Sequence, residues 1–222
     1  MKDIGIFLTG CGNLDGADIE EAVLLHYFLN KKGYRTIFLA LDIEQKEVVN
    51  HLTQEVISER RNILVESSRI SKRKIENLKG FPSNQIEGLI LVGGEGNKKS
   101  VAEFDDKKEI WSVNSDLRNL VREVFRRKRP MGACGLATLV VAFSLKPIVT
   151  SPLTLTLGND AKLIKVLEDY GCNHIITRPE EAVLDEKHKL VSTSGSCHTS
   201  NILELAIGLE NLVSGISDFI KK

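Results

Sequence analysis

The sequence predicts an α/β protein with a parallel sheet that helices cover on both faces. Three observations indicate this fold. Short apolar runs alternate with amphipathic, helix-like stretches along the 222 residues, which is the order that builds parallel strands joined by helices. The runs are continuously apolar, as in strands buried on both faces. Glycine-containing turns follow three of the four main strands, with the sequences "TGCGNLDG", "VGGEGN" and "GACGLA".

The first half of the chain supplies three strands and one helix. The apolar run "DIGIFLT" (3–9) is expected to be a strand that ends at the first glycine-rich turn. A helix is expected over 17–32, because acids occupy its first turn and Lys31-Lys32-Gly33 stand at its end. The runs "RTIFLAL" (35–41) and "EGLILVGG" (87–94) are the second and third strands.

Residues 43–80 do not fit a simple connection between two strands. They are rich in charge and contain the helix-like stretch "SERRNILVESSRI". We expect this segment to be an elaboration packed outside the sheet and not a second domain. The prediction for residues 1–222 is therefore a single domain, a length that one α/β domain can reach.

The second half of the chain continues the alternation. A polar, amphipathic helix over 112–128 leads into "PMGAC" (130–134), the fourth main strand, and a helix over 136–145 follows. The remaining elements are a strand at "PLTLTL" (152–157), a helix over 160–170, short strands near "HII", "AVL" and "KLVST", and a last helix over 199–220.

Composition and charge argue against several classes of function. Lys plus Arg and Asp plus Glu both number 30, and this balance disfavours nucleic acid as a partner, since phosphate binding depends on an excess of basic residues. The longest apolar run, "LATLVVAFSL", is much shorter than a membrane span, so no membrane partner is expected. None of the glycine-rich turns matches a dinucleotide motif or a P-loop, and no nucleotide cofactor is expected.

The cysteines and histidines predict neither a metal site nor a disulfide framework. The four cysteines are not paired at zinc-ligand spacing, and the five histidines are scattered. The N-terminal run "IGIFL" is too short for the core of a signal peptide. We therefore expect a reduced, cytoplasmic protein, with Cys172 and Cys197 in structural roles.

Glu21 is a candidate proton donor or acceptor. It lies in the first turn of the predicted helix over 17–32, on the same face as Leu24 and Leu25. A carboxyl group at the head of an apolar stripe is expected to be partly buried, and burial raises its pKa. The alternative is a solvated acid that complements the helix N-terminus.

The glycine-rich turns are candidate walls of a pocket. Ligands of parallel sheets collect beyond the carboxyl ends of the strands, so these turns build one pocket if they converge. Cys11, in the first turn, is either a thiol of this pocket or a small buried hydrophobe.

Several stretches together resemble a known family. They are "TGCGNLDGADIEEAVL", "VVNHLTQEVISERRNILVESSRI", "LVGGEGNKKS", "LTLTLGND" and "DEKHKLVSTS". They resemble the ElbB-like family, also called sigma cross-reacting or isoprenoid-biosynthesis glyoxalase proteins, a branch of the superfamily of PfpI-type proteases and class I glutamine amidotransferases. The resemblance implies a flavodoxin-like, doubly wound α/β/α sandwich, commonly a homodimer. It also implies a weak glutathione-independent glyoxalase that converts methylglyoxal to lactate, with a pocket for a small carbonyl or carboxylate ligand and no cofactor.

The resemblance also implies roles for individual residues. Glu21 matches the superfamily's glutamate, Gly93 and Gly94 match a glycine pair whose N–H groups hold an oxyanion, and Cys11 matches a cysteine usual in this branch. The chain departs from the pattern at Val92, where a proline usually precedes the glycine pair. The histidine that often supports the catalytic cysteine has no clear match.

The nucleophile elbow leaves two alternatives. The family's motif reads Pro, aliphatic, Gly, two residues, the nucleophilic Cys, then aliphatic-Ala. Without a gap, Pro130-Met131-Gly132 and Leu136-Ala137 place Gly135 at the nucleophile position and Cys134 at the end of the strand. A one-residue deletion in the strand would instead make Cys134 the nucleophile, with Glu21 relaying protons and the N–H groups of Gly94 and Gly135 holding the oxyanion.

The two alternatives predict different functions. If Gly135 holds the turn, glyoxalase activity is expected to be weak or lost. The chain would then be a small-molecule-binding, redox-sensing or partner-binding protein on an enzyme fold. If Cys134 holds the turn, a glyoxalase-like lyase is expected.

Overall fold

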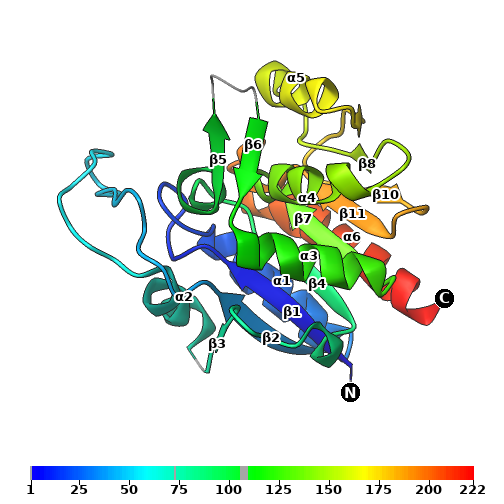
Figure 1. Ribbon diagram of the computed structural model, residues 1–222, viewed down its shortest axis with the longest axis horizontal. Helices are drawn as coiled ribbons and strands as arrows, with labels where there is room; N and C mark the ends of the chain where they lie inside the picture. The colour runs from blue at the N-terminus through cyan, green and yellow to red at the C-terminus, as the bar shows by residue number, and fades with distance from the viewer. Residues whose placement is uncertain (1, 73, 106–109) are drawn as a thin grey trace.

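The computed structural model describes residues 2–72, 74–105 and 110–222, and it is built around a seven-stranded sheet (Figure 1). The strand order is β10-β11-β7-β4-β1-β2-β3, and each neighbouring pair is parallel except β10 with β11. The strands are β1 (Asp3–Leu8), β2 (Arg35–Ala40), β3 (Glu76–Asn77), β4 (Gly88–Leu91), β7 (Met131–Cys134), β10 (Val183–Asp185) and β11 (Leu190–Thr193). This arrangement confirms the predicted flavodoxin-like α/β fold.

Helices form a layer on each face of the sheet. On one face, α1 (Ile19–Lys31) and α6 (Ile202–Lys221) pack together over an apolar core. On the other face, α3 (Ser115–Arg126) and α4 (Ala137–Leu145) cover a second core, and α5 (Ala161–Asp169) packs at its margin (Figure 1). Every residue of α4 is buried, which explains why its sequence is apolar on all sides.

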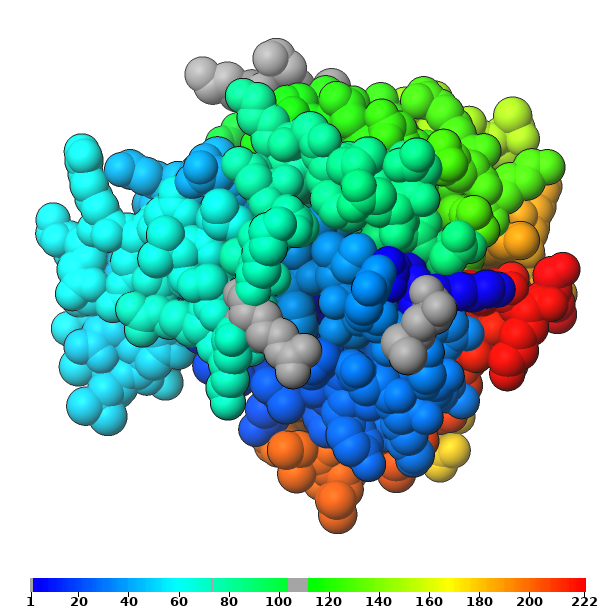
Figure 2. Space-filling model, turned by 90° about the horizontal axis from the view of Figure 1, so that it is seen from below, coloured from blue at the N-terminus to red at the C-terminus, as the bar shows by residue number. Residues whose placement is uncertain are grey.

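Residues 43–80 are only partly an outlying elaboration. Their helix α2 (Ile63–Ser71) packs against β2, and a long loop precedes it. Figure 2 shows the cyan part of this segment projecting from one side of the molecule. The short strand β3, however, pairs with β2 and extends the main sheet by one strand. The expectation that the whole segment packs outside the sheet is therefore incorrect for β3.

Two small sheets were not predicted. A hairpin of β5 (Ala102–Asp105) and β6 (Ile110–Val113) precedes α3, where the sequence favoured the start of a helix. The strands β8 (Thr154–Leu155) and β9 (Asn173–His174) pair with each other in a separate parallel sheet. The alternating Thr and Leu of "PLTLTL" suit this position, because a small sheet buries one face while a central strand must bury both. None of the described helices is long and apolar enough to span a bilayer.

Candidate functional site

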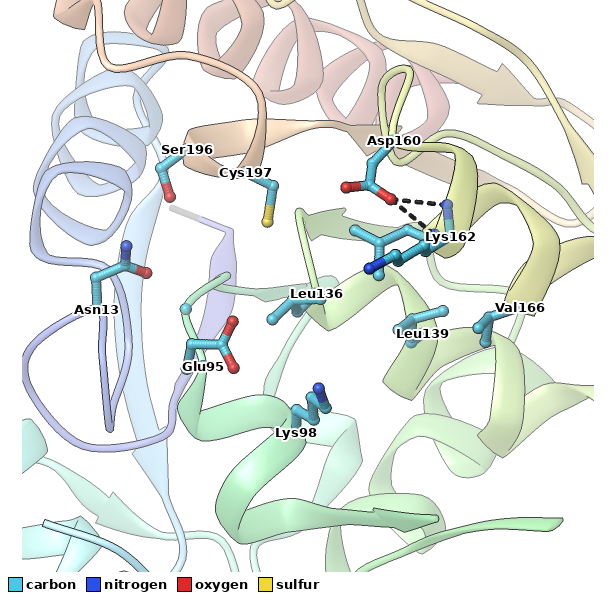
Figure 3. Close-up of a pocket in the computed structure, with 12 residues that line it drawn as sticks. Asn13, Glu95, Lys98, Leu136, Leu139, Asp160, Lys162, Val166, Ser196 and Cys197 are labelled. Atoms are coloured by element: carbon cyan, nitrogen blue, oxygen red, sulfur yellow. Dashed lines mark hydrogen bonds between the residues drawn. The ribbon is translucent and has the colours of Figure 1, made fainter. Parts of the chain in front are cut away.

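A cavity of about 450 Å³ opens beyond the carboxyl ends of β1, β4, β7 and β11 (Figure 3). Each of the three glycine-rich turns contributes to its lining, so the condition under which they build one pocket is met. The lining residues are Asn13, Gly94, Glu95, Lys98, Leu136, Leu139, Asp160, Lys162, Leu163, Val166, Ser196 and Cys197. Because loops from four strand ends meet here, the cavity lies where parallel α/β sheets place their ligands.

The lining combines an apolar wall with a charged rim. The wall consists of side chains from the start of α4 and from α5, namely Leu136, Leu139, Leu163 and Val166. Lys98 and Lys162 supply positive charge to the rim, and Glu95 and Asp160 supply negative charge. The Asp160 carboxylate caps α5, accepting from the N–H groups of Lys162 at 2.8 Å and Leu163 at 3.0 Å, so part of its charge is already satisfied.

Glu21 is fully buried beneath this cavity, in the first turn of α1. Its Oε2 accepts from the Gly93 N–H at 2.7 Å and its Oε1 from the Ser196 N–H at 2.8 Å. Burial, together with the nearby Asp18, raises the pKa of the Glu21 carboxyl group to about 7. The expectation of a buried carboxyl group with a raised pKa is confirmed, and the alternative of a solvated acid is excluded.

The glycine pair fits closely around this carboxyl group. A Cβ atom on Gly93 would lie 2.7 Å and 2.9 Å from the two carboxylate oxygens of Glu21. Only glycine allows the turn to approach so closely. The Gly93 N–H is occupied by Glu21, whereas Gly94, with φ of 101°, lines the cavity. Among the described residues, none accepts from the Gly94 N–H, so Gly94 is the member of the pair that could face a ligand.

At the elbow, Cys134 is the last residue of β7 and Gly135 forms the turn, with φ of 47°. The Cys134 side chain is fully buried in the core shared with α1 and α6. Burial, and to a smaller extent the charge of Glu21, raises its pKa well above the ordinary value of a thiol. The structure therefore agrees with the alignment that has no gap. Gly135 is at the turn, and the Cys134 thiol does not reach the cavity.

Gly135 does not provide an oxyanion donor. Its N–H donates to the Thr193 carbonyl oxygen at 3.0 Å, since β7 and β11 are paired up to this point. The expectation that the Gly135 N–H holds an oxyanion is therefore wrong.

Cys11 lies away from the cavity, although Asn13 of the same turn lines it. Its thiol is partly buried, and burial together with Glu66 of α2 raises its pKa. Other charged neighbours, Arg69, Asp15 and Arg61, also lie toward the side of α2. The structure thus places Cys11 against the elaboration and not in the pocket.

Sequence reasoning missed Cys197, which it treated as structural. Cys197 is exposed and lines the cavity with Ser196, in a single 3₁₀ turn over Gly195–Cys197. Glycine at 195 allows this turn to pass directly over Glu21, because a Cβ atom there would collide with the carboxylate oxygen Oε1. A signal was present: "SGSC" directly follows the strand "KLVST", so it stands at the ligand-binding edge of the sheet.

The cavity offers no arrangement typical of a metal centre. Within the described residues, no group of three or more His, Cys, Asp or Glu side chains is placed to hold a metal ion.

Curated relatives cover nearly the whole chain. The ES1 protein homolog, mitochondrial, of Rattus norvegicus is 28% identical over 230 residues, covering 99% of this chain and 82% of its own. The human glutamine amidotransferase-like class 1 domain-containing protein 3, mitochondrial, is 27% identical and covers 89% of this chain and 76% of its own. No protein-family model matches the chain.

Solved structures share the fold. An isoprenoid biosynthesis protein with an amidotransferase-like domain from Ehrlichia chaffeensis superposes with a TM-score of 0.92 at 27% identity, covering 99% of both chains. A ThiJ/PfpI domain protein from Brachyspira murdochii superposes with a TM-score of 0.60 at 12% identity, covering 98% of this chain and 96% of its own. This second likeness concerns the fold alone.

These relatives overturn the expected location. The two relatives above and the ES1 protein of Danio rerio are all named as mitochondrial proteins, which contradicts a cytoplasmic protein. The prediction failed because it depended on reduced cysteines, and thiols that form no disulfide do not identify one compartment. The convergent strand ends, the buried Glu21 beneath a glycine pair and the relatives together support the superfamily of class I glutamine amidotransferase-like proteins, and the chain shares its fold with ThiJ/PfpI domain proteins.

Proposed function

We propose that the chain is an ElbB-like protein whose cavity binds a small carbonyl- or carboxylate-bearing molecule, and that turnover of methylglyoxal by an elbow cysteine is weak or lost. One observation carries this proposal: Gly135 occupies the turn while Cys134 is sealed in the core. A nucleophile has to reach its substrate, and a thiol that is fully buried in the core cannot attack a ligand in the cavity.

The lining of the cavity supports the class of ligand. Four aliphatic side chains suit an apolar body, and the ammonium groups of Lys98 and Lys162 suit a carboxylate or a polarised carbonyl oxygen. Methylglyoxal is much smaller than a cavity of about 450 Å³. A larger molecule, with an aliphatic part beside its carbonyl or carboxylate group, would fill it better.

Lactate formation from methylglyoxal tests the enzymatic half of the proposal. The wild-type protein is expected to form lactate at a rate close to the uncatalysed one, and Cys134→Ala is expected to change nothing. The double variant Gly135→Cys/Cys197→Ala places a thiol at the elbow and removes the Cys197 side chain that would obstruct it. This variant is expected to gain lactate formation. Rapid lactate formation by the wild type that Cys134→Ala abolishes would refute the proposal.

Binding of hexanoate, a carboxylate with an aliphatic chain, tests the other half. Its NMR signals are expected to broaden in the presence of the wild-type protein. The broadening should weaken in Lys98→Gln or Lys162→Gln, while the surface variant Lys79→Gln serves as a matched control outside the cavity. Equal broadening in all of these variants would contradict a role for the rim lysines.

A further inference from the structure

The space in which an elbow side chain would begin is occupied by the thiol of Cys197. A Cβ atom on Gly135 would lie 2.8 Å from the Cys197 Sγ and 3.2 Å from the Ser194 carbonyl oxygen. A carbon and a sulfur atom cannot approach to 2.8 Å without a shift of one of them, so a side chain at position 135 would displace the Cys197 thiol from the position that it holds. The chain combines a glycine at the elbow with a thiol that arrives from the loop after β11.

Two groups next to the elbow, one from α4 and one from α1, influence the pKa of this thiol. The backbone N–H of Leu136, the N-cap residue of α4, favours the thiolate form of Cys197 and so lowers its pKa. Glu21 reaches the same place from below, because the N–H of Ser196, the residue before Cys197, donates to its carboxylate at 2.8 Å. The thiol itself faces the cavity, as Figure 3 shows. A thiol, a helix N-terminus and a buried carboxyl group therefore lie close together here. The thiol, however, follows β11, whereas the elbow follows β7.

We infer that Cys197 is the nucleophile of this cavity, in place of an elbow cysteine, and that it forms a reversible hemithioacetal with an aldehyde bound there. The inference rests on the proposed function, because it takes the cavity as the place where a carbonyl ligand binds. In the addition, the sulfur–carbon bond forms, the π bond of the carbonyl group opens, and the thiol proton passes to the carbonyl oxygen. The adduct is the sum of thiol and aldehyde, so the step requires no oxidant or other reactant.

The protonation states indicate how the addition proceeds. Cys197 is exposed as a residue, but its sulfur lies against the elbow, where the loss of water and the charge of Glu21 raise the pKa of its thiol to about 12. The resting group near neutral pH is thus the protonated thiol, whose proton must leave as the sulfur attacks. Glu21, with its pKa raised to about 7 by burial, is partly carboxylate near neutral pH and contacts this turn through the Ser196 N–H, so it is the candidate base. The addition is expected to be slow and pH-dependent.

NMR of the full chain with ¹³C-labelled methylglyoxal tests this inference. A hemithioacetal resonance is expected in the wild type, and it should be lost in Cys197→Ser. The resonance should persist in Cys134→Ala, whose thiol is sealed in the core, and in Cys11→Ser, whose thiol lies outside the cavity. Gly135→Ala should also weaken the resonance, because the added methyl group displaces the Cys197 sulfur. A resonance that persists in Cys197→Ser, or that is absent from the wild type, would overturn the inference.

Hexanoate separates this inference from the proposed function. Its binding involves no covalent step, so it is expected to be retained in Cys197→Ser, and an excess of hexanoate should suppress the Cys197-dependent resonance in the wild type. If hexanoate binds but no resonance depends on Cys197, the inference fails and the proposed pocket stands. If hexanoate does not bind, the proposed carboxylate pocket fails, while a resonance that depends on Cys197 would still support the nucleophile.

Discussion

At the scale of single residues, a buried carboxyl group lies beneath the floor of the cavity. Glu21 has no exposed surface, and its two oxygens accept from the N–H groups of Gly93 and Ser196. These hydrogen bonds favour the ionised form, whereas burial and Asp18 disfavour it, and burial is the largest effect. The result is a carboxyl group that changes its charge close to neutral pH.

The raised pKa of Glu21 predicts a pH-dependent stability. A carboxyl group whose pKa rises from 4.5 to about 7 on folding binds its proton more tightly in the folded state. Its stabilising contribution is complete below the unfolded pKa and is lost as the pH rises through the folded pKa. The loss is about 3 kcal/mol for a fully buried group, at 1.36 kcal/mol per unit of pKa.

Denaturant unfolding at several pH values measures this effect. The free energy of unfolding of the wild type, relative to that of Glu21→Gln, is expected to fall between about pH 4.5 and about pH 7, the unfolded and folded pKa values of Glu21, and to level off above them. Glu20→Gln, which changes an exposed acid of the same helix turn, should show no such trend. A difference between the wild type and Glu21→Gln that does not vary with pH would show that Glu21 does not titrate in this range.

At the scale of elements, α5 forms one wall of the cavity, and the hydrogen bonds of its N-cap hold its first turn. The Asp160 carboxylate accepts from two N–H groups of that turn. Leu163 and Val166 of the same helix line the cavity. The helix has nine residues and buries only Leu167 completely. Because so short a helix gains little from burial, its cap contributes a large share of its stability.

Replacement of the cap is therefore expected to loosen this wall. Asp160→Ala should lower the free energy of unfolding by about 1 kcal/mol and weaken the broadening of hexanoate signals. Asp160→Asn, which keeps an accepting oxygen and removes the charge, should retain most of the stability. Hydrogen exchange of the α5 amides, followed by NMR, measures the effect directly. If Asp160→Ala and Asp160→Asn weaken hexanoate binding equally, the weaker binding would result from the loss of the Asp160 charge and not from the loss of the helix cap.

At the scale of the whole molecule, the helices α1 and α6 present apolar side chains to solvent. Val23 and Tyr27 of α1 and Leu203 and Ile207 of α6 are exposed, and the two helices pack side by side. The Lys31 Nζ lies 2.9 Å from the Glu210 Oε1, in an exposed ion pair that joins the two helices. Exposed apolar surface of this kind is typical of an interaction site.

The homodimer stays a prediction, and this face is where we expect it. The variant Tyr27→Lys/Ile207→Lys should shift the protein from dimer to monomer in sedimentation experiments, with little effect on the fold, because both side chains are exposed. The control Leu52→Lys changes an exposed apolar side chain in the loop before α2 and should leave the dimer intact. A wild-type protein that sediments as a monomer at high concentration would refute the prediction.

The sequence by itself determined the parts of the fold that depend on local patterns. Continuous apolar runs specify strands buried on both faces, and β1, β2, β4 and β7 lie where these runs predicted them. The position of Glu21 in the first turn of α1, at the head of an apolar stripe, together with the resemblance to the family, predicted its burial, which the structure shows. The spacing around the elbow, compared with the motif of the resembled family, favoured Gly135 at the turn, because a deletion would have reversed the facing of the strand, but it left Cys134 as an alternative that the structure excludes.

Only the tertiary structure decided which thiol faces the cavity. Cys134 and Cys197 stand far apart in the sequence. The position of "SGSC" after a strand places Cys197 at the ligand-binding edge of the sheet, but it does not show that the Cys197 thiol lies against the elbow while the Cys134 thiol points into the core. The pairing of β11 with β7 brings the turn over Gly195–Cys197 against the elbow, and the same pairing occupies the Gly135 N–H. Such contacts depend on the order of strands in the sheet, which is a long-range property that propensity and spacing do not encode.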